Sequence, residues 1–243
     1  MKMKKIDWKI LIITSLLCLA PICVGLEYYD VLPENIAIHF DINNNPNNFC
    51  AKDAFVFGMP LLMLAIQVFT SILVDLNDKR KDANKKVTFV AKLMIPIITI
   101  ILYGVTISYA LGNMLDIRKI AMWIVGIMFV VVGNYTPKTK GNTFVKGLKV
   151  EDEVLQAKLN KIVGYMFIID GLLAIISTFL ETIFSVFVIL LVILEMLVLQ
   201  IWMCKKLEEI GKLSMKEKIA VILTLVILII IGLLMFILFK SAM

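Results

Sequence analysis

A series of apolar segments, each about as long as a membrane is thick, most constrains what this chain can fold into. The hydrocarbon core of a bilayer is about 30 Å thick, so a helix needs roughly 20 apolar residues to cross it. The 243-residue chain is 60% hydrophobic, which excludes an ordinary soluble domain. We therefore expect an all-α membrane protein, a polytopic bundle of about seven transmembrane helices, with spans at residues 8–28, 55–74, 91–112, 117–133, 162–180, 183–203 and 219–239.

The positions of the basic residues predict the orientation of this bundle. Cytoplasmic loops of membrane proteins carry an excess of Lys and Arg. Of the 25 basic residues, all but Lys52, Arg118, Lys119 and Lys240 fall on the side of the membrane that holds the N-terminus, if the seven segments all cross. The sequence therefore predicts a cytoplasmic N-terminus and an external C-terminus.

The fourth segment has a short apolar run and must hold Arg118 and Lys119 at its outer end, where long side chains reach the headgroups. If it did not cross, the basic loops that follow it would face outside, so we expect it to span. The net charge of +6 does not predict nucleic-acid binding, because orientation and attraction to anionic lipid account for the short basic loops. Membrane lipid is thus the expected partner, with no direct contact to nucleic acid.

The external loop at residues 29–54 is too long for a simple connector. Pro33 prevents the first helix from continuing, and Ile36, Ile38 and Phe40 alternate with smaller or polar residues, which predicts a short strand. The Asn-rich residues 43–48 predict a turn, and Asp53 is a candidate cap for the second helix. The single histidine, His39, could contact an external partner, or could merely bond the loop backbone or lie among headgroups.

The cytoplasmic loop at residues 134–161 is also long. Gly133, Asn134 and Pro137 end the fourth helix, and Tyr135 suits the aromatic belt at the membrane surface. Acidic residues at 151–153 come before apolar residues with helical spacing, and Lys158 and Lys161 follow. This order suits a helix that lies in the interface before the fifth span.

Two carboxyl groups, those of Asp170 and Glu195, fall inside predicted spans. An ionised carboxylate at the bilayer centre costs about 2.5–3.5 kcal/mol on insertion scales, and neither residue has an obvious basic partner. They could be protonated, bond to Gln67, Gln200 or hydroxyl groups of neighbouring helices, or face a wet cavity. An ion or proton path is the functional interpretation, and an interhelical polar contact worth about 0.6 kcal/mol is the structural one.

An enzyme is not expected. The sequence holds no zinc-protease helix motif, no nucleophile elbow and no P-loop. A single histidine cannot form a histidine-based metal site, and Asp170 is the only deep aspartate. We therefore predict no cofactor and no metal.

Two motifs give the chain a resemblance to a known family. The first consists of Leu32, Pro33, Ile36, His39, Phe40, Pro46, Phe49 and Lys52, and the second of Gly133, Asn134, Tyr135, Pro137, Lys138, Thr139 and Asn142. In this order, with helices between them, they resemble the SdpI family of bacterial immunity proteins. The chain differs from the family pattern in lacking four residues after Lys149, in carrying Asn160 for a His and Asn44 for a Gly, and in having a seventh span rather than six.

The resemblance implies a domain organisation. Residues 1–75 would form an SdpI-like N-terminal module around the external loop, and residues 76–181 an SdpI-like core that carries the cytoplasmic loop. Residues 182–243 would be C-terminal helices, of which the last is an addition.

The resemblance also implies a function in the bacterial plasma membrane. The protein would bind a secreted peptide toxin at its outer face, confer resistance, and signal by sequestering a cytoplasmic repressor. Pro33, Ile36, His39, Phe40, Phe49 and Lys52 would form the external site, and the second motif the cytoplasmic one. The alternative is an ion-coupled transporter or exporter that uses Asp170 and Glu195.

Overall fold

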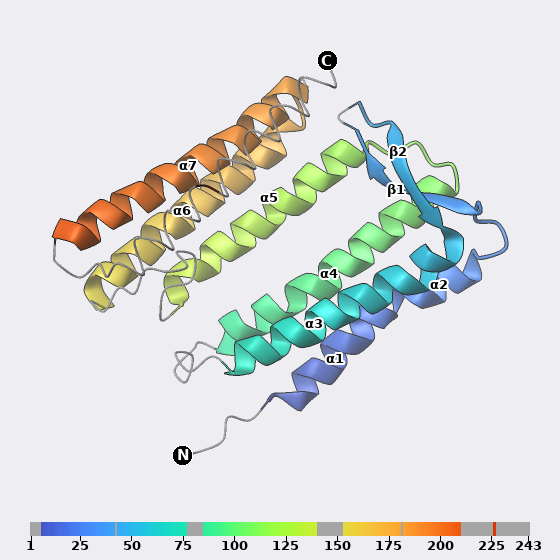
Figure 1. Cartoon of the computed structure of the whole chain (residues 1–243), viewed down its shortest axis with the longest axis horizontal. Coiled ribbons are helices and arrows are strands. Elements are labelled where there is room, and N and C mark those ends of the chain that lie inside the picture. Colours follow the sequence, from blue (N-terminus) through green and yellow to red (C-terminus); the bar gives the residue numbers. More distant parts are fainter. Residues whose placement is uncertain are drawn as a thin grey trace. The chain divides into compact units, whose positions relative to one another are not determined.

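The computed structural model describes residues 6–41, 43–76, 85–139, 153–180, 182–209 and 226 (Figure 1). The chain divides into two compact units, Met1–Ile120 and Ala121–Met243, and each is described by itself. Within the described residues, helices account for most of the chain and one β-hairpin for the only strands.

Three long helical segments and the hairpin make up the first unit. They are α1 (Trp8–Leu19) with α2 (Pro21–Glu27), α3 (Met59–Leu76) and α4 (Lys85–Ala110), while β1 (Asn35–Phe40) and β2 (Pro46–Ala51) form the hairpin. Helices α1, α3 and α4 pack against one another, and the hairpin lies at one end of them (Figure 1). Helix α1 begins where the Asp7 side chain accepts a hydrogen bond from the backbone of Ile10.

Prolines interrupt the helical hydrogen bonds of α3 and α4, and in each case a side chain of the other helix supplies the missing donor. Pro60 has no N–H to donate to the carbonyl of Val56, and it follows a turn of π-helix, η1 (Ala54–Gly58). The hydroxyl of Tyr103 on α4 donates to that carbonyl at 3.3 Å. Pro96 likewise leaves the carbonyl of Lys92 without its helical donor, and the side-chain amide of Gln67 on α3 donates to it at 2.9 Å. The two helices are thus joined by the polar groups that their own prolines expose.

The second unit contains most of α5 (Ile117–Tyr135), the 3-10 turn η3 (Thr136–Lys138), α6 (Glu153–Ser177) and α7 (Thr182–Glu209). Helices α5 and α6 approach closely at two glycine pairs. A Cβ on Gly171 would lie 2.5 Å from the carbonyl oxygen of Gly126, and one on Gly133 would lie 2.6 Å from that of Gly164. Both pairs are spaced by seven residues on each helix, so glycine lets two turns of backbone meet.

Helix α7 packs against α6. The hydroxyls of Ser177 and Ser185 are hydrogen-bonded at 3.2 Å near the turn that joins the two helices. Further along, Leu199 of α7 belongs to a buried cluster with Leu159, Val163 and Phe167 of α6. The two helices therefore run antiparallel, as Figure 1 shows for the elements labelled α6 and α7.

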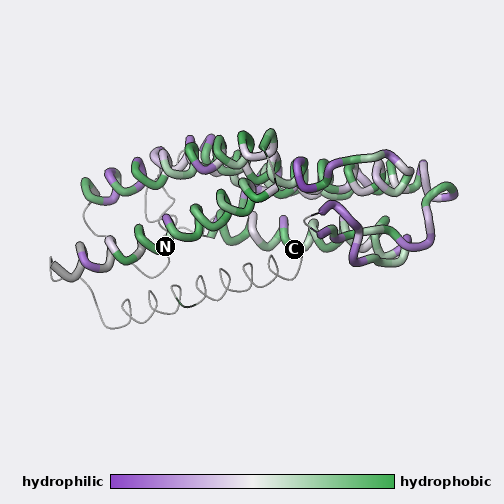
Figure 2. The backbone as a smooth tube through the Cα atoms, turned by 90° about the horizontal axis from the view of Figure 1, so that it is seen from above, coloured by the Kyte–Doolittle hydropathy of each residue, from purple (hydrophilic) through white to green (hydrophobic). Residues whose placement is uncertain are grey.

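Six helical segments of the described chain are long and apolar enough to cross a membrane, and they correspond to the first six predicted spans. Figure 2 shows that these helices are mostly hydrophobic, while hydrophilic residues gather on the hairpin and at helix ends. The chain is therefore a multi-pass helical membrane protein. The predicted seventh span, residues 219–239, lies outside the described residues apart from Val226.

Two loop boundaries differ from the sequence predictions. Helix α4 begins at Lys85 rather than at residue 91, so Lys92, whose charge we counted with the basic residues on the N-terminal side, lies well inside it and is 1% exposed. Helix α6 begins at Glu153, so Lys158 and Lys161 belong to it, and it continues to Ser177 without a separate interfacial helix. Apolar runs mark where a span must exist, but a helix can extend beyond the run when its polar residues find partners or reach the headgroups.

Candidate functional site

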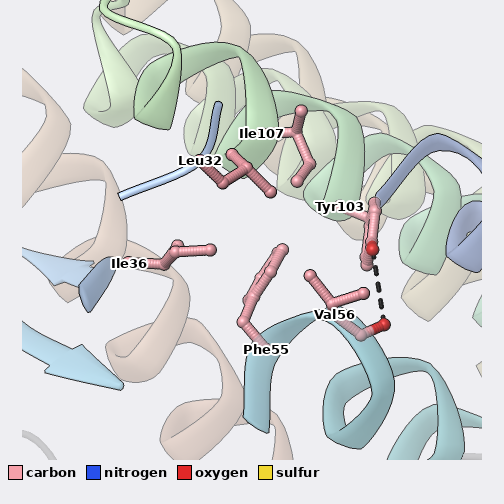
Figure 3. Packing of buried hydrophobic residues seen from close by; sticks show 6 residues of the cluster. All are labelled: Leu32, Ile36, Phe55, Val56, Tyr103 and Ile107. Carbon is pink, nitrogen blue, oxygen red and sulfur yellow. Dashed lines mark hydrogen bonds between the residues drawn. The ribbon is translucent and has the colours of Figure 1, made fainter. Parts of the chain in front are cut away.

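The hairpin packs on a buried apolar cluster. Leu32, Ile36, Phe55, Val56, Tyr103 and Ile107 form this cluster, to which the hairpin, η1 and α4 all contribute (Figure 3). Ile36 is fully buried, and the rings of Phe55 and Tyr103 stack with centroids 4.9 Å apart. The hairpin is therefore fixed to the helical unit by the same hydrophobic effect that holds a small domain together.

The predicted strand is confirmed, but its strict alternation is wrong. Strands β1 and β2 are antiparallel, and the register shifts twice, between Ala37 and His39 and between His39 and Phe40. The neighbours Ile36 and Ala37, which precede the first shift, are both buried, while Ile38, which lies within it, is 48% exposed. A bulge adds residues to one strand and rotates the side chains that follow, which a period of two cannot anticipate.

Asp41 organises the tip of the hairpin. Its carboxylate accepts hydrogen bonds from the backbone N–H groups of Asn43 and Asn45, at 2.9 and 2.8 Å, and from the side-chain amide of Asn45 at 3.2 Å. These bonds, above all the one from the backbone of Asn45, hold the pKa of Asp41 below its ordinary value of 3.8. The predicted turn is confirmed but shorter than residues 43–48, because β2 already begins at Pro46.

Asn44 connects this tip to the segment between α4 and α5. Its backbone has φ of +69°, the left-handed conformation expected where the family pattern has glycine. Unlike glycine, it adds two hydrogen bonds: its side chain donates to the carbonyl of Leu115 at 2.8 Å and accepts from the N–H of Ile117 at 2.7 Å. Asn44 therefore ties the hairpin to the start of α5.

A second set of polar contacts closes the base of the hairpin. Lys52 pairs with Glu34 at 3.0 Å, and its ammonium lies 4.6 Å from the centre of the Tyr29 ring. Tyr29 donates a hydrogen bond to Asp53. The prediction that Asp53 caps the second helix is wrong, since its side chain makes no capping bond and serves Tyr29 instead.

The six external residues predicted from the sequence divide into two groups. Pro33, His39 and Phe49 are exposed, and Phe49 retains 51% of its accessible surface. Ile36, Phe40 and Lys52 instead support the hairpin, from the core, against the ring of Tyr109, and through Glu34, respectively. The ring of His39 interacts with the side chain of Asn47 on the facing strand. The exposed members, and Ile38 with them, are the side chains of this segment that solvent reaches.

The second motif, predicted to be cytoplasmic, lies where α5 ends and η3 begins, and it packs against α6. Gly133 meets Gly164, and a Cβ on Gly164 would come within 2.8 Å of the Pro137 ring. Asn160, the residue that replaces a family histidine, donates from its side chain to the carbonyl of Thr139 at 3.1 Å. These contacts place Gly133, Pro137 and Thr139 in the framework of the second unit.

The remaining members of this motif stand at its surface. Lys138 donates to the side chain of Asn134 at 3.2 Å, and its ammonium lies 4.9 Å from the centre of the Tyr135 ring. Asn134 and Lys138 are exposed, and Tyr135 is half-buried. Asn142 and the position after Lys149 lie outside the described residues.

Asp170 of α6 is fully buried, and neither of its carboxyl oxygens accepts a hydrogen bond from an N–H or O–H donor of the described chain. Glu195 of α7 interacts with it electrostatically. Gln67, one of the partners considered from the sequence, bonds Ser71 and the backbone of Lys92 in the first unit instead. The structure thus brings the two intramembrane carboxyl groups together.

Sequence reasoning missed several polar residues that the structure uses. Lys92 pairs with Asp75 at 2.7 Å, with its side chain fully buried, and Tyr103 and Gln67 repair the proline breaks. Pro60 and Pro96 were the sequence features that could have revealed these donors, because a proline inside a span leaves a carbonyl that needs a donor from a neighbouring helix. The identity of that donor depends on packing.

Comparison with known proteins gives one domain match. A domain family described as a domain of unknown function, DUF1648, matches residues 16–64. This domain is common in membrane proteins, SdpI-like ones included. No curated protein and no solved structure matches the chain. The match covers the end of α1, α2, the hairpin, η1 and the start of α3, which is the part of the first unit that builds and supports the hairpin.

Proposed function

We propose that the protein is a non-catalytic receptor of the bacterial plasma membrane, similar to the SdpI immunity proteins, which binds a secreted peptide toxin through its hairpin. The observation that carries the proposal is the coincidence of the matched domain with the hairpin and its supports. The order of the external and cytoplasmic motifs adds to it.

The shape and chemistry of the hairpin suit this function. The hairpin packs on the buried cluster, and Asn44 bonds its tip to the segment before α5. Its conformation is therefore fixed before a partner binds. The hairpin exposes the apolar side chains of Ile38 and Phe49 and the polar pair of His39 and Asn47. An extended amphipathic peptide matches such a surface, with apolar anchors and a few polar contacts to orient it.

A protection assay tests the proposal. The protein is expressed in toxin-sensitive cells that lack their own immunity protein, its membrane level is measured, and the cells are challenged with the sporulation-delaying peptide toxin. We expect survival with the natural protein and loss of survival with His39→Ala and with Phe49→Ala. Absence of protection at normal membrane levels would contradict immunity to this toxin.

Leu62→Ala provides the matched control for Phe49→Ala. Leu62 is an equally apolar, exposed residue, but it lies on α3, away from the hairpin. A receptor surface confined to the hairpin predicts that Leu62→Ala protects as well as the natural protein. Equal losses with both variants would indicate a general effect of removing apolar surface rather than a binding site.

The cytoplasmic motif supports a signalling step in the same proposal. Asn134 and Lys138 are exposed beside Tyr135, at the end of α5, and could bind a repressor protein when toxin occupies the outer face. Lys138→Ala is expected to prevent expression of the genes that the repressor controls, while protection from the toxin stays intact. Coupled loss of both would contradict a separate cytoplasmic function.

A second candidate function is an ion-coupled transporter or exporter. The observation that favours it is the buried, unpartnered carboxyl group of Asp170 beside Glu195. In the protection assay this candidate predicts failure of Asp170→Asn and mild effects of His39→Ala. The receptor predicts the reverse.

A further inference from the structure

The carboxylate of Asp170 is buried at a position where the described chain offers it no N–H or O–H donor. The residue is 0% exposed, and both of its side-chain oxygens lack hydrogen-bond partners there. Burying a polar group without a hydrogen bond costs free energy, and burying an unpaired charge costs more. A fully buried carboxyl group without donors around it is more stable in its neutral, protonated form.

Glu195 is the acidic group that faces Asp170, and the packing of α6 against α7 explains why. The bond between Ser177 and Ser185 sets the register of the two helices on one side of the pair. The cluster that joins Phe167 to Leu199 sets it on the other side. Asp170 follows Phe167 by three residues, and Glu195 precedes Leu199 by four, so each stands about one helical turn from that contact.

The charges nearby do not neutralise the pair. On α6 the other described titratable side chains, Lys158, Lys161 and Tyr165, are exposed, whereas Asp170 is buried. On α5 within the second unit, Tyr135 is the only titratable residue, and it lies beside Gly133, two turns from the Gly126 contact with Gly171. On α7 the described contact to Asp170 comes from Glu195.

We propose that Asp170 and Glu195 form a proton-binding carboxyl pair, in which one proton is held between the two groups within the membrane. When two carboxyl groups share a site, both cannot ionise without strong repulsion, so one of them retains a proton. A metal ion suits the site less well, because the described chain brings no group of three or more His, Cys, Asp or Glu residues together. This inference goes beyond toxin binding and does not depend on it.

A hydrophobic carbodiimide tests the proton directly. A protonated carboxyl group gives its proton to a carbodiimide nitrogen while its oxygen bonds to the central carbon, and no group leaves, so the adduct adds the whole reagent mass. The full-length protein in lipid nanodiscs is treated with dicyclohexylcarbodiimide over a series of pH values, and adducts are located by peptide mass spectrometry. We expect an adduct on Asp170 or Glu195 that decreases as the pH rises.

Variants separate a shared proton from an isolated one. Glu195→Gln is expected to weaken labelling of Asp170 at a fixed neutral pH, because the negative neighbour that favours the protonated form is removed. Asp170→Asn is expected to lose labelling at position 170. Asp170→Glu is expected to retain it, because this variant keeps a carboxyl group there. Asp75 is the internal control: its two carboxyl oxygens are bound by the Lys92 ammonium and by the backbone N–H of Asp7, so it should stay unlabelled.

Three results would overturn the proposal. They are the absence of an adduct on both residues at every pH, an adduct on Asp170 whose pH dependence is unchanged by Glu195→Gln, and protection from labelling by sodium at constant pH and ionic strength. The last would assign a metal ion instead of a proton. Failure of toxin protection has no bearing on this measurement, so the two proposals are tested separately.

Discussion

Asp75 and Asp170 are both acidic residues of apolar helices, one in each unit, and their surroundings are opposite. Asp75 accepts hydrogen bonds from the ammonium of Lys92 at 2.7 Å and from the N–H of Asp7 at 3.0 Å. Asp170 has no such donor within the described residues and faces another carboxyl group. A paired charge supports the structure, whereas an unpaired carboxyl group is left free to exchange a proton. Burial alone does not tell the two apart.

The largest effect is expected from breaking the pair in the first unit. Lys92→Met leaves the carboxylate of Asp75 without its cation, which costs about 3–5 kcal/mol for a buried pair. The free energy of unfolding, measured on protein in detergent micelles, should fall by that amount and recover in large part when Asp75→Asn is added. Asp170→Asn, by contrast, should not reduce it. A comparable loss from Asp170→Asn would show that Asp170 also has a structural partner.

A smaller effect should come from the packing that distinguishes the second unit, where glycines rather than side chains bring the helices together. Gly171→Ala places a Cβ 2.5 Å from the backbone oxygen of Gly126, and overpacking of this kind costs about 1–3 kcal/mol. Gly104→Ala on α4 is the matched control, since a Cβ there meets nothing within 4 Å. Thermal unfolding of both variants checks the difference. Equal midpoints would contradict the close approach of α5 and α6.

The first unit depends instead on side chains that replace missing helical donors. Tyr103→Phe removes the donor to the carbonyl of Val56, and an unsatisfied buried acceptor costs about 1–3 kcal/mol. Gly25→Ala should also destabilise, because its Cβ would collide with the Tyr103 hydroxyl. A double-mutant cycle on unfolding free energies should show coupling, with Gly25→Ala less damaging in the Tyr103→Phe protein. Additive losses of unfolding free energy would contradict the contact between Gly25 and Tyr103.

The smallest effect is expected at the hairpin tip, where the carboxylate is exposed and its pKa is lowered by hydrogen bonds. The folded state holds Asp41 ionised more strongly than the unfolded state does. The stabilisation is therefore complete above the ordinary pKa of 3.8 and is lost as the pH falls through the lower, folded value. Hydrogen exchange at Asn43 and Asn45 should accelerate over that acidic range in the natural protein and show no such pH dependence in Asp41→Asn.

Much of the architecture could be predicted from the sequence because the bilayer imposes it. Apolar runs of sufficient length gave six spans that the described helices confirm, and Pro33 and the Asn-rich run located a strand and a turn. Asn44, which stands where the family pattern has glycine, adopts the left-handed backbone that glycine favours, with φ of +69°. These predictions are local, since each depends on one segment and its solvent.

The site could be predicted less well because its roles depend on contacts between segments. The sequence grouped Ile36 with His39 as external site residues, but Ile36 is buried in the cluster beneath the hairpin and His39 is exposed. It counted Lys92 only as one of the basic residues on the side of the N-terminus, whereas Asp75 pairs with it inside the first unit. Ile38 was assigned to the strand but not to the exposed surface.

The sequence by itself determined that this chain is a multi-pass helical membrane protein, because a long apolar segment has few alternatives to a helix in lipid. It also determined that prolines, glycines and carboxyl groups stand inside the spans. Only the tertiary structure decided what each of them meets: Tyr103 and Gln67 at the exposed carbonyls, glycine against glycine between α5 and α6, Lys92 beside Asp75, and Glu195 beside Asp170. Hydrogen bonds, charges and close packing act over a few ångströms, so the register between helices fixes them.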